Sequence, residues 1–160
     1  MEAVIHTATS GMLARILSVI LTSALPFVEN KGAILFAAAL KMKWYFAYAL
    51  TCIGSFAPVP FLLKLWRSGA QPRGRLVAAV KRALDRHGEI LHKYGPWALF
   101  LLVSIPLTGI GCWIGSILAD LCNMDRKRSA VAIACGTLVS GLIMTLGVYG
   151  LIGGIRYLFR

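Results

Sequence analysis

The chain has 160 residues, of which 58% are hydrophobic and 14% are charged, and its mean hydropathy is +0.75. A soluble domain of this size needs more polar surface to cover its core, so the composition indicates an integral membrane protein instead. The net charge is +11, and most of the basic residues stand between apolar segments. This placement points to membrane topology and anionic lipid, and we expect no nucleic-acid partner.

No motif of soluble enzyme chemistry occurs in the sequence. The four cysteines form no C-x-x-C pair, the three histidines form no H-E-x-x-H, and P-loop, dinucleotide and G-x-S-x-G sequences are missing. We therefore expect no enzyme activity, no cofactor and no metal site. The cysteines, all in or beside apolar segments, are expected to be buried and inert.

The first apolar region contains a short charged sequence. Uncharged residues surround Glu29 and Lys31 on both sides. Pro26 lacks an amide donor and Gly32 loosens the chain, so a continuous helix is not expected here. A broken helix with ionisable groups at membrane depth has to line an enclosed or watery cavity, as in a transport site.

Residues 44–63 are twenty uncharged residues, enough for a helix of about 30 Å that crosses a bilayer. Pro58 and Pro60 lie in its second half and remove two amide donors. We expect a kinked spanning helix whose free carbonyl groups face a cavity.

A basic connection follows over residues 64–93, with a linker at 69–74 and a net charge of +6. From Leu76 onward apolar residues recur at helical spacing, which predicts an amphipathic helix in the membrane interface. We favour a positive-inside cytoplasmic loop over a dedicated collector of lipid or substrate phosphate. The residues expected to contact anionic headgroups are Arg73, Arg75, Lys81, Arg82 and Arg86.

Residues 94–119 form a second uncharged stretch, which residues 105–111 break in the middle. The nine residues before this break span only about 13 Å as a helix, half a bilayer. We therefore predict a re-entrant hairpin that returns to the side it came from. Residues 129–155 are a final uncharged crossing.

The two halves of the chain follow one design, a broken apolar hairpin and then a spanning helix. Pro26 is matched by Pro106, and Gly54 by Gly136. Because each half has one net crossing, the two units are inverted, as in secondary transporters whose site lies where the breaks meet. The predicted fold is an all-α integral membrane protein of a single membrane domain, with unit one at about 9–67, the basic connection and amphipathic helix at about 68–94, and unit two at about 95–158.

Three sequences resemble a known family, the prokaryotic small multidrug export proteins, which are similar in turn to the DedA/VTT superfamily with its re-entrant segments. They are Glu29-Asn-Lys-Gly-Ala-Ile34, Pro58-Val-Pro-Phe-Leu-Leu63 and the glycine-rich run from Ser104 to Gly115. The resemblance covers about residues 15–150. Lys31 stands where the family pattern has Arg, which keeps the charge but loses the planar fork that binds an oxyanion with two hydrogen bonds.

The candidate site combines the charged pair with the helix breaks. Glu29 is expected to couple transport to protons or cations, or to partner Lys31 or free helix amides. Lys31 either contacts an anion or extends towards water. Trp113 either stacks on a flat cation or packs in the core. The full set of predicted site residues is Glu29, Lys31, Gly32, Pro58, Pro60, Pro106, Thr108, Gly109, Gly111 and Trp113.

The resulting prediction is a small multi-pass transporter of the prokaryotic inner membrane, exporting a small organic molecule with proton coupling through Glu29. The resemblance to DedA proteins implies an alternative, a flippase or scramblase for a phosphate-headed lipid such as polyprenyl phosphate. A scaffold that transports nothing is a third class. One well-placed acid per chain also suggests a homodimer.

Overall fold

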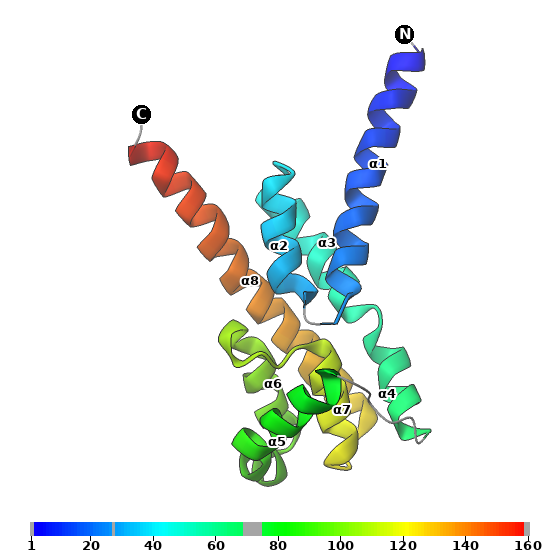
Figure 1. Cartoon of the computed structure of the whole chain (residues 1–160), viewed down its shortest axis with the longest axis vertical. Coiled ribbons are helices and arrows are strands. Elements are labelled where there is room, and N and C mark those ends of the chain that lie inside the picture. The colour runs from blue at the N-terminus through cyan, green and yellow to red at the C-terminus, as the bar shows by residue number, and fades with distance from the viewer. Residues whose placement is uncertain (1, 27, 69–74, 159–160) are drawn as a thin grey trace.

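The described residues, 2–26, 28–68 and 75–158 of a computed structural model, are helical and contain no strand, as the sequence predicts (Figure 1). Arg73, the linker around it and the side chain of Arg75 lie outside the described part. In chain order the elements are α1 (Glu2–Ala24), α2 (Glu29–Ala39), α3 (Trp44–Phe56), α4 (Val59–Arg67), α5 (Arg75–Tyr94), α6 (Pro96–Ser104), the 3-10 turn η1 (Pro106–Thr108), α7 (Cys112–Leu121) and α8 (Arg126–Leu158).

Two stretches of the described chain are long and apolar enough to cross a membrane, Trp44–Trp66 and Arg126–Gly154. The first runs through α3 and α4, and the second is most of α8. They run in opposite directions, α3 and α4 downward and α8 upward in the view of Figure 1. The final helix is longer than the predicted crossing, since it begins at Arg126 and ends at Leu158.

The prolines interrupt the first of these stretches, as expected. α3 ends at Phe56, and α4 begins at Val59 with Pro58 as its N-cap. Pro60 lies in the first turn of α4, where a missing amide hydrogen costs little. The carbonyl of Pro60 accepts a hydrogen bond of 3.1 Å from Nη2 of Arg126, so this group binds α8 and not a cavity.

Two helical hairpins lie beside these long stretches. α1 descends to the middle of the molecule and α2 returns upward, while α6 and α7 form the second hairpin in the lower half (Figure 1). In each hairpin the first helix packs on the spanning stretch of its own half, α1 on α3 and α6 on α8, while the second helix packs on both stretches, α2 on α3 and α8 and α7 on α4 and α8.

A glycine sits at the contact of α3 with α1 and another at the contact of α8 with α6. A Cβ atom added to Gly54 of α3 would lie 2.7 Å from the carbonyl oxygen of Ile20 in α1. A Cβ atom added to Gly136 of α8 would lie 2.8 Å from Cβ of Val103 in α6. Only glycine lets the backbones approach this closely. Both glycines that the sequence comparison of the two halves paired thus lie at helix contacts, and the repeat itself stays a prediction.

α5 packs with its apolar stripe against protein. Val80, Ala83 and Leu91 are buried in a cluster shared with α4, α6, α7 and the start of α8, whereas Lys81 and Arg86 are exposed. α6 and α7 cover this stripe. The place of α5 in the membrane interface and contact of its exposed basic face with headgroups stay predictions.

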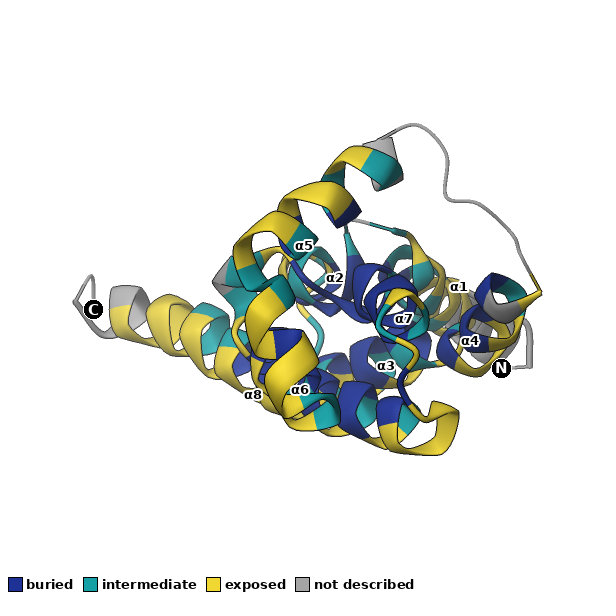
Figure 2. Cartoon of the chain, turned by 90° about the horizontal axis from the view of Figure 1, so that it is seen from below, coloured by how far each residue is buried: buried dark blue, intermediate teal, exposed yellow. Residues whose placement is uncertain are grey.

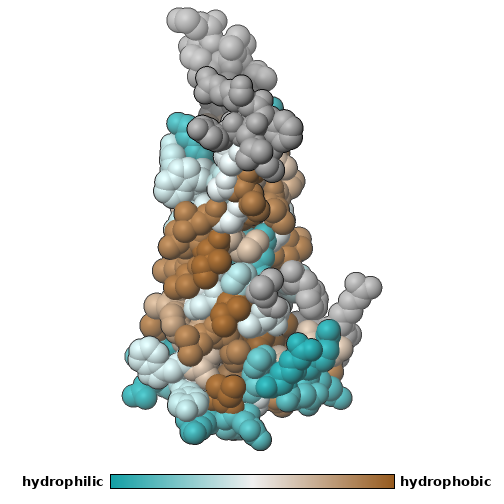
Figure 3. Space-filling view, turned by 90° about the vertical axis from the view of Figure 1, so that its left-hand side faces the viewer, coloured by the Kyte–Doolittle hydropathy of each residue, from teal (hydrophilic) through white to brown (hydrophobic). Residues whose placement is uncertain are grey.

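The outer surface is apolar over much of its height. Exposed leucines follow the described part of α1 and α8, and Figure 2 shows α8 exposed along its outer face. The face in Figure 3 is hydrophobic in its middle and hydrophilic at the lower end, where α5 and the start of α8 lie. This is the distribution that a bilayer requires. Two cysteines, Cys52 and Cys112, are buried as expected, but Cys122 is half-buried and Cys135 is exposed on α8.

Candidate functional site

The first turn of α2 brings a carboxylate into the interior. Glu29 is 6% exposed and has φ +45°, in the left-handed region. A non-glycine residue pays of order 1–3 kcal/mol for a conformation of this kind, so the surroundings have to hold it. Its amide donates to the carbonyl of Leu25 at 3.2 Å, across the turn between α1 and α2.

The carboxylate of Glu29 binds the start of α7. Oε1 accepts a hydrogen bond of 3.1 Å from the amide of Trp113, which lies 84 residues further along the chain. The first amides of a helix have no partner inside the helix and carry partial positive charge, so a carboxylate is stabilised there. Glu29 thereby joins the two hairpins where their breaks meet.

Gly111 makes this approach possible. A Cβ atom at this position would overlap the carboxylate of Glu29. The absence of a side chain thus leaves space at the start of α7 that the two carboxylate oxygens fill. The sequence predicted Gly111 as a site residue because of the break, and the structure puts it in contact range of Glu29.

Trp113 also contacts the first hairpin through its ring. Nε1 donates a hydrogen bond of 3.0 Å to the carbonyl of Ala24, the last residue of α1. The half-buried indole therefore serves as a cap for α1. Of the two predicted roles, this arrangement matches packing inside the protein, and the indole N–H is already used.

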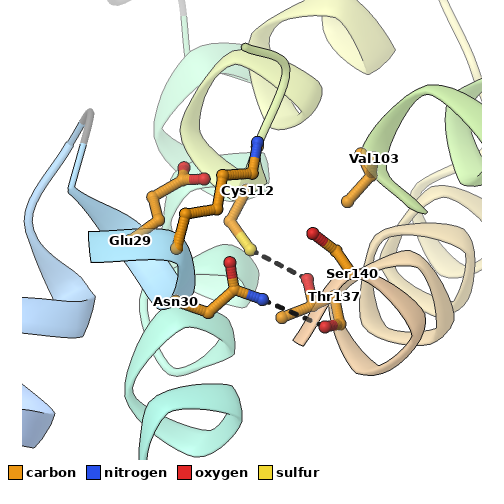
Figure 4. A pocket seen from close by; sticks show the side chains of 8 residues that line it. Glu29, Asn30, Val103, Cys112, Thr137 and Ser140 are labelled. Atoms are coloured by element: carbon orange, nitrogen blue, oxygen red, sulfur yellow. Dashed lines mark hydrogen bonds between the residues drawn. The ribbon is translucent and has the colours of Figure 1, made fainter. Parts of the chain in front are cut away.

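A small cleft lies between the two helix starts (Figure 4). Its empty volume is about 160 Å³. Because this is less than the roughly 300–1,000 Å³ of a pocket for a drug-sized ligand, we call this arrangement the closed conformation. Eight residues line it: Glu29, Asn30, Lys31, Val103, Gly111, Cys112, Thr137 and Ser140. They come from α2, α6, the start of α7 and α8.

Thr137 connects the polar groups of the cleft. Nδ2 of Asn30 donates to the carbonyl of Thr137 at 3.1 Å, and Sγ of Cys112 lies 3.1 Å from the hydroxyl of Thr137. That hydroxyl itself donates to the carbonyl of Ile133 at 2.8 Å. Ser140, one turn further along α8, is 1% exposed, and its hydroxyl has no partner among the described residues.

Lys31 lines the same cleft and is half-buried. Among the residues that the structure describes, it forms neither a hydrogen bond nor an ion pair, even with Glu29 two residues away. Its ammonium group is therefore available to a ligand.

The remaining predicted residues lie outside the cleft. Pro106 begins the turn η1, and Gly109 ends it with φ +71°. The Thr108 hydroxyl bonds the carbonyls of Leu102 at 2.7 Å and Ile105 at 2.9 Å and accepts from the amide of Ile110. This hydroxyl stabilises the break internally.

Gly32, Pro58 and Pro60 also do not line the cleft. Gly32 lies within α2, where an added Cβ would lie 2.7 Å from Cγ1 of Val28. The two prolines lie at the junction of α3 and α4. Their part in substrate binding stays a prediction.

Sequence analysis missed five lining residues: Asn30, Val103, Cys112, Thr137 and Ser140. Asn30 stands beside Glu29, which was the available signal. Thr137 and Ser140 lie within the uncharged run 129–155, which gives no local signal of a site. Among the described residues no three His, Cys, Asp or Glu side chains form a group that could hold a metal ion.

Comparison with known proteins gives a family. The model of the family described as "Putative small multi-drug export protein" matches residues 29–143, well over half of the chain. The match begins at Glu29 and includes every lining residue of the cleft. No curated protein and no solved structure matches the chain.

The family description names export, which agrees with a transporter rather than an enzyme. Together with the two long apolar stretches, it places the chain in a membrane. A relationship to DedA proteins stays a prediction. The three sequence motifs had indicated this family, and the match confirms it: the chain belongs to the small multi-drug export protein family.

Proposed function

We propose that this protein transports a small organic molecule across the prokaryotic inner membrane through the cleft between α2 and α7, and that Glu29 couples transport to protons. The observation that carries the proposal is the hydrogen bond from the Trp113 amide to the Glu29 carboxylate. An ionisable group buried where two helix breaks meet is typical of secondary transporters.

The packing of the helices supports an inverted repeat. The hairpin of α1 and α2 and the hairpin of α6 and α7 approach the cleft from opposite ends of the molecule (Figure 1). Each hairpin packs on both long stretches, α1 and α2 on α3 and α8, and α6 and α7 on α8 and α4. Rocking of one unit against the other would open the cleft to alternate sides.

The proton has a defined role in this scheme. An ionised Glu29 holds the start of α7 by a charge-assisted hydrogen bond and by attraction to the helix dipole. Protonation removes the charge and weakens both interactions. Because the closed cleft has no room for a substrate, separation of the units has to precede binding. Proton uptake at Glu29 thereby favours the open state.

Flux measurements in proteoliposomes test this proposal. Wild type, Glu29→Gln and Glu89→Gln are compared with a panel of cationic, neutral and anionic dyes under pH gradients of both signs. Glutamine can still accept the Trp113 hydrogen bond, so the first variant removes mainly the charge. Glu89, exposed on α5, is the matched control. In wild type and Glu89→Gln we expect the flux of at least one dye to differ at least tenfold between the two signs of the pH gradient. In Glu29→Gln the flux should be the same under both gradients.

Other results would contradict parts of the proposal. Unchanged gradient dependence in Glu29→Gln would remove Glu29 as the coupling group. Absence of any flux from correctly inserted wild type would favour the scaffold. A fluorescent polyprenyl phosphate belongs in the panel because the exposed Lys81, Arg82 and Arg86 on α5 favour the lipid alternative. Transfer of that lipid alone would make the protein a flippase.

A further inference from the structure

We propose that the cleft binds its substrate through an oxyanion group, a carboxylate, phosphate or sulfonate, and that the carboxylate of Glu29 occupies this place in the closed conformation. The inference rests on the proposed function, because it names the chemical class of the molecule that is transported. Three features of the cleft carry it.

The first feature is the shape of the site at the start of α7. Oε1 of Glu29 accepts from the Trp113 amide, and the carboxylate fills the space that a Cβ of Gly111 would take. α7 has ten residues, so its first amides form a full helix N-terminus, which favours an anion. A planar pair of oxygens already fits here, as the side chain of Glu29 demonstrates.

The second feature is the hydroxyl of Ser140. It is buried, it lacks a partner among the described residues, and in Figure 4 it points into the cleft. Asn30 and Cys112 each bond to Thr137, so Ser140 differs from its neighbours. A buried hydroxyl without a partner is unfavourable, and an acceptor oxygen of a ligand would satisfy it. The hydroxyl is independent of the helix N-terminus and points to the same class of ligand.

The third feature is the balance of charge. The titratable groups that face the cleft are Glu29 and Lys31 from α2 and Cys112 from α7, with Cys52 of α3 behind Thr137 at 3.9 Å from its carbonyl. An ionised Glu29 offsets the charge of Lys31. Once Glu29 is protonated, the ammonium group and the start of α7 lack a counter-charge, which favours an incoming anion and disfavours a cation.

Proton binding and oxyanion binding therefore favour one another. The substrate oxyanion and the proton bound to Glu29 would leave the cell together. The higher concentration of the substrate inside the cell would drive this export. In the Glu29→Gln variant an amide that is neutral at every pH replaces the carboxylate, so oxyanion affinity should no longer depend on pH.

The test uses two ligands of the same size and opposite charge, naphthalene-2-sulfonate and 2-naphthyltrimethylammonium. Their affinities for purified protein in nonionic detergent are measured from the ligand-dependent rise in the thermal unfolding midpoint, at mildly acidic and mildly alkaline pH. We expect the sulfonate to bind wild type at least tenfold more tightly at acidic pH. The cation should not bind. Glu29→Gln should bind the sulfonate equally at both pH values.

Variants of serine supply the matched control. Ser140→Ala should lower sulfonate affinity at least tenfold, as should Lys31→Gln. Ser129→Ala should leave it unchanged, because Ser129 is also fully buried with an unpartnered hydroxyl but does not line the cleft. Both serine variants remove an unsatisfied hydroxyl, so both should fold.

Dioleoyl phosphatidic acid in mixed micelles forms a second arm. If wild type binds this lipid but not the sulfonate, and Ser140→Ala loses the lipid binding, the oxyanion belongs to a lipid headgroup. Equal sulfonate affinity in wild type and Ser140→Ala, or binding of the cation alone, would overturn the inference. Cation flux with coupling through Glu29 would overturn the oxyanion inference and leave the proposed function intact. Sulfonate binding without flux of any tested molecule would support the oxyanion site and contradict the proposed transport function.

Discussion

The contact between Gly111 and Glu29 depends on a hydrogen atom standing where every other residue has a carbon. At this point the backbone of one hairpin and the charged side chain of the other share the same small volume. The position of the carboxylate, its left-handed backbone and its hydrogen bond to Trp113 are consequently one connected arrangement.

Gly111→Ala should displace the carboxylate and destabilise the protein by about 1–3 kcal/mol, the usual cost of overpacking. Glu29→Gly removes the carboxylate and also relieves the left-handed conformation. The double variant should therefore be less destabilised than the sum of the two single changes. The free energy of unfolding of each variant in mixed micelles measures this coupling. If the losses of the two single variants add up to the loss of the double variant, the two residues do not share the space.

Thr108 provides a second test at the residue scale. Thr108→Val keeps the shape of the side chain but leaves the amide of Ile110 and two carbonyls of the break without the hydroxyl, which should cost about 1–3 kcal/mol. Thr108→Ser retains the hydroxyl and should stay close to wild type. Thermal unfolding distinguishes the two variants. Equal midpoints would mean that the hydroxyl does not stabilise the break.

At the scale of the helices, two glycines allow the hairpins to pack on the long stretches. Gly54→Ala would bring a methyl group against the backbone of α1, and Gly136→Ala would do so against α6. Each change should destabilise the protein by about 1–3 kcal/mol. Gly147→Ala on α8 has nothing within 4 Å and should be neutral or, through helix propensity, slightly stabilising. Similar losses at all three positions would contradict the packing.

Sequence patterns located the helix breaks because proline acts locally. Pro26, Pro58 and Pro106 each stand within a residue or two of a helix end in the structure. The charged residue at the first break was also found from sequence alone, since Glu29 is conspicuous between apolar runs.

The rest of the cleft depends on contacts between distant segments. Thr137 and Ser140 lie in a long uncharged run that reads equally well as any spanning helix, and only the packing of α2 on α8 gives them a role. Similarly, an amphipathic pattern has the same period whether lipid or protein covers it. For this reason the sequence could not show that α6 and α7 cover the apolar stripe of α5.

The whole molecule has unequal ends. α5 and the basic start of α8 lie at the lower end in Figure 1, whereas α1 begins and α8 ends at the upper end. α5 carries the exposed Lys81, Arg82 and Arg86. By the positive-inside rule we expect the end with more Lys and Arg in short connections to face the cytoplasm. Both termini of the described chain should then lie on the outer side of the membrane.

Reporter fusions at Arg160 test this orientation. Alkaline phosphatase becomes active only outside the cytoplasm. Green fluorescent protein behaves in the opposite way: it fluoresces in the cytoplasm but stays dark after export through the general secretion route. We expect an active phosphatase fusion and a dark fluorescent one. The opposite pair of results would invert the molecule and place α5 outside.

The bond from Trp113 to Glu29 also sets an order of events during biosynthesis. The ribosome completes α1, α2 and α3 long before it reaches Trp113, 84 residues after Glu29. Throughout that interval the Glu29 carboxylate lacks the Trp113 amide that it later binds. The carbonyl of Ala24 at the end of α1 likewise lacks the indole N–H of Trp113. The first half of the newly made chain therefore enters the membrane unfinished, and it becomes complete only when the second half arrives beside it.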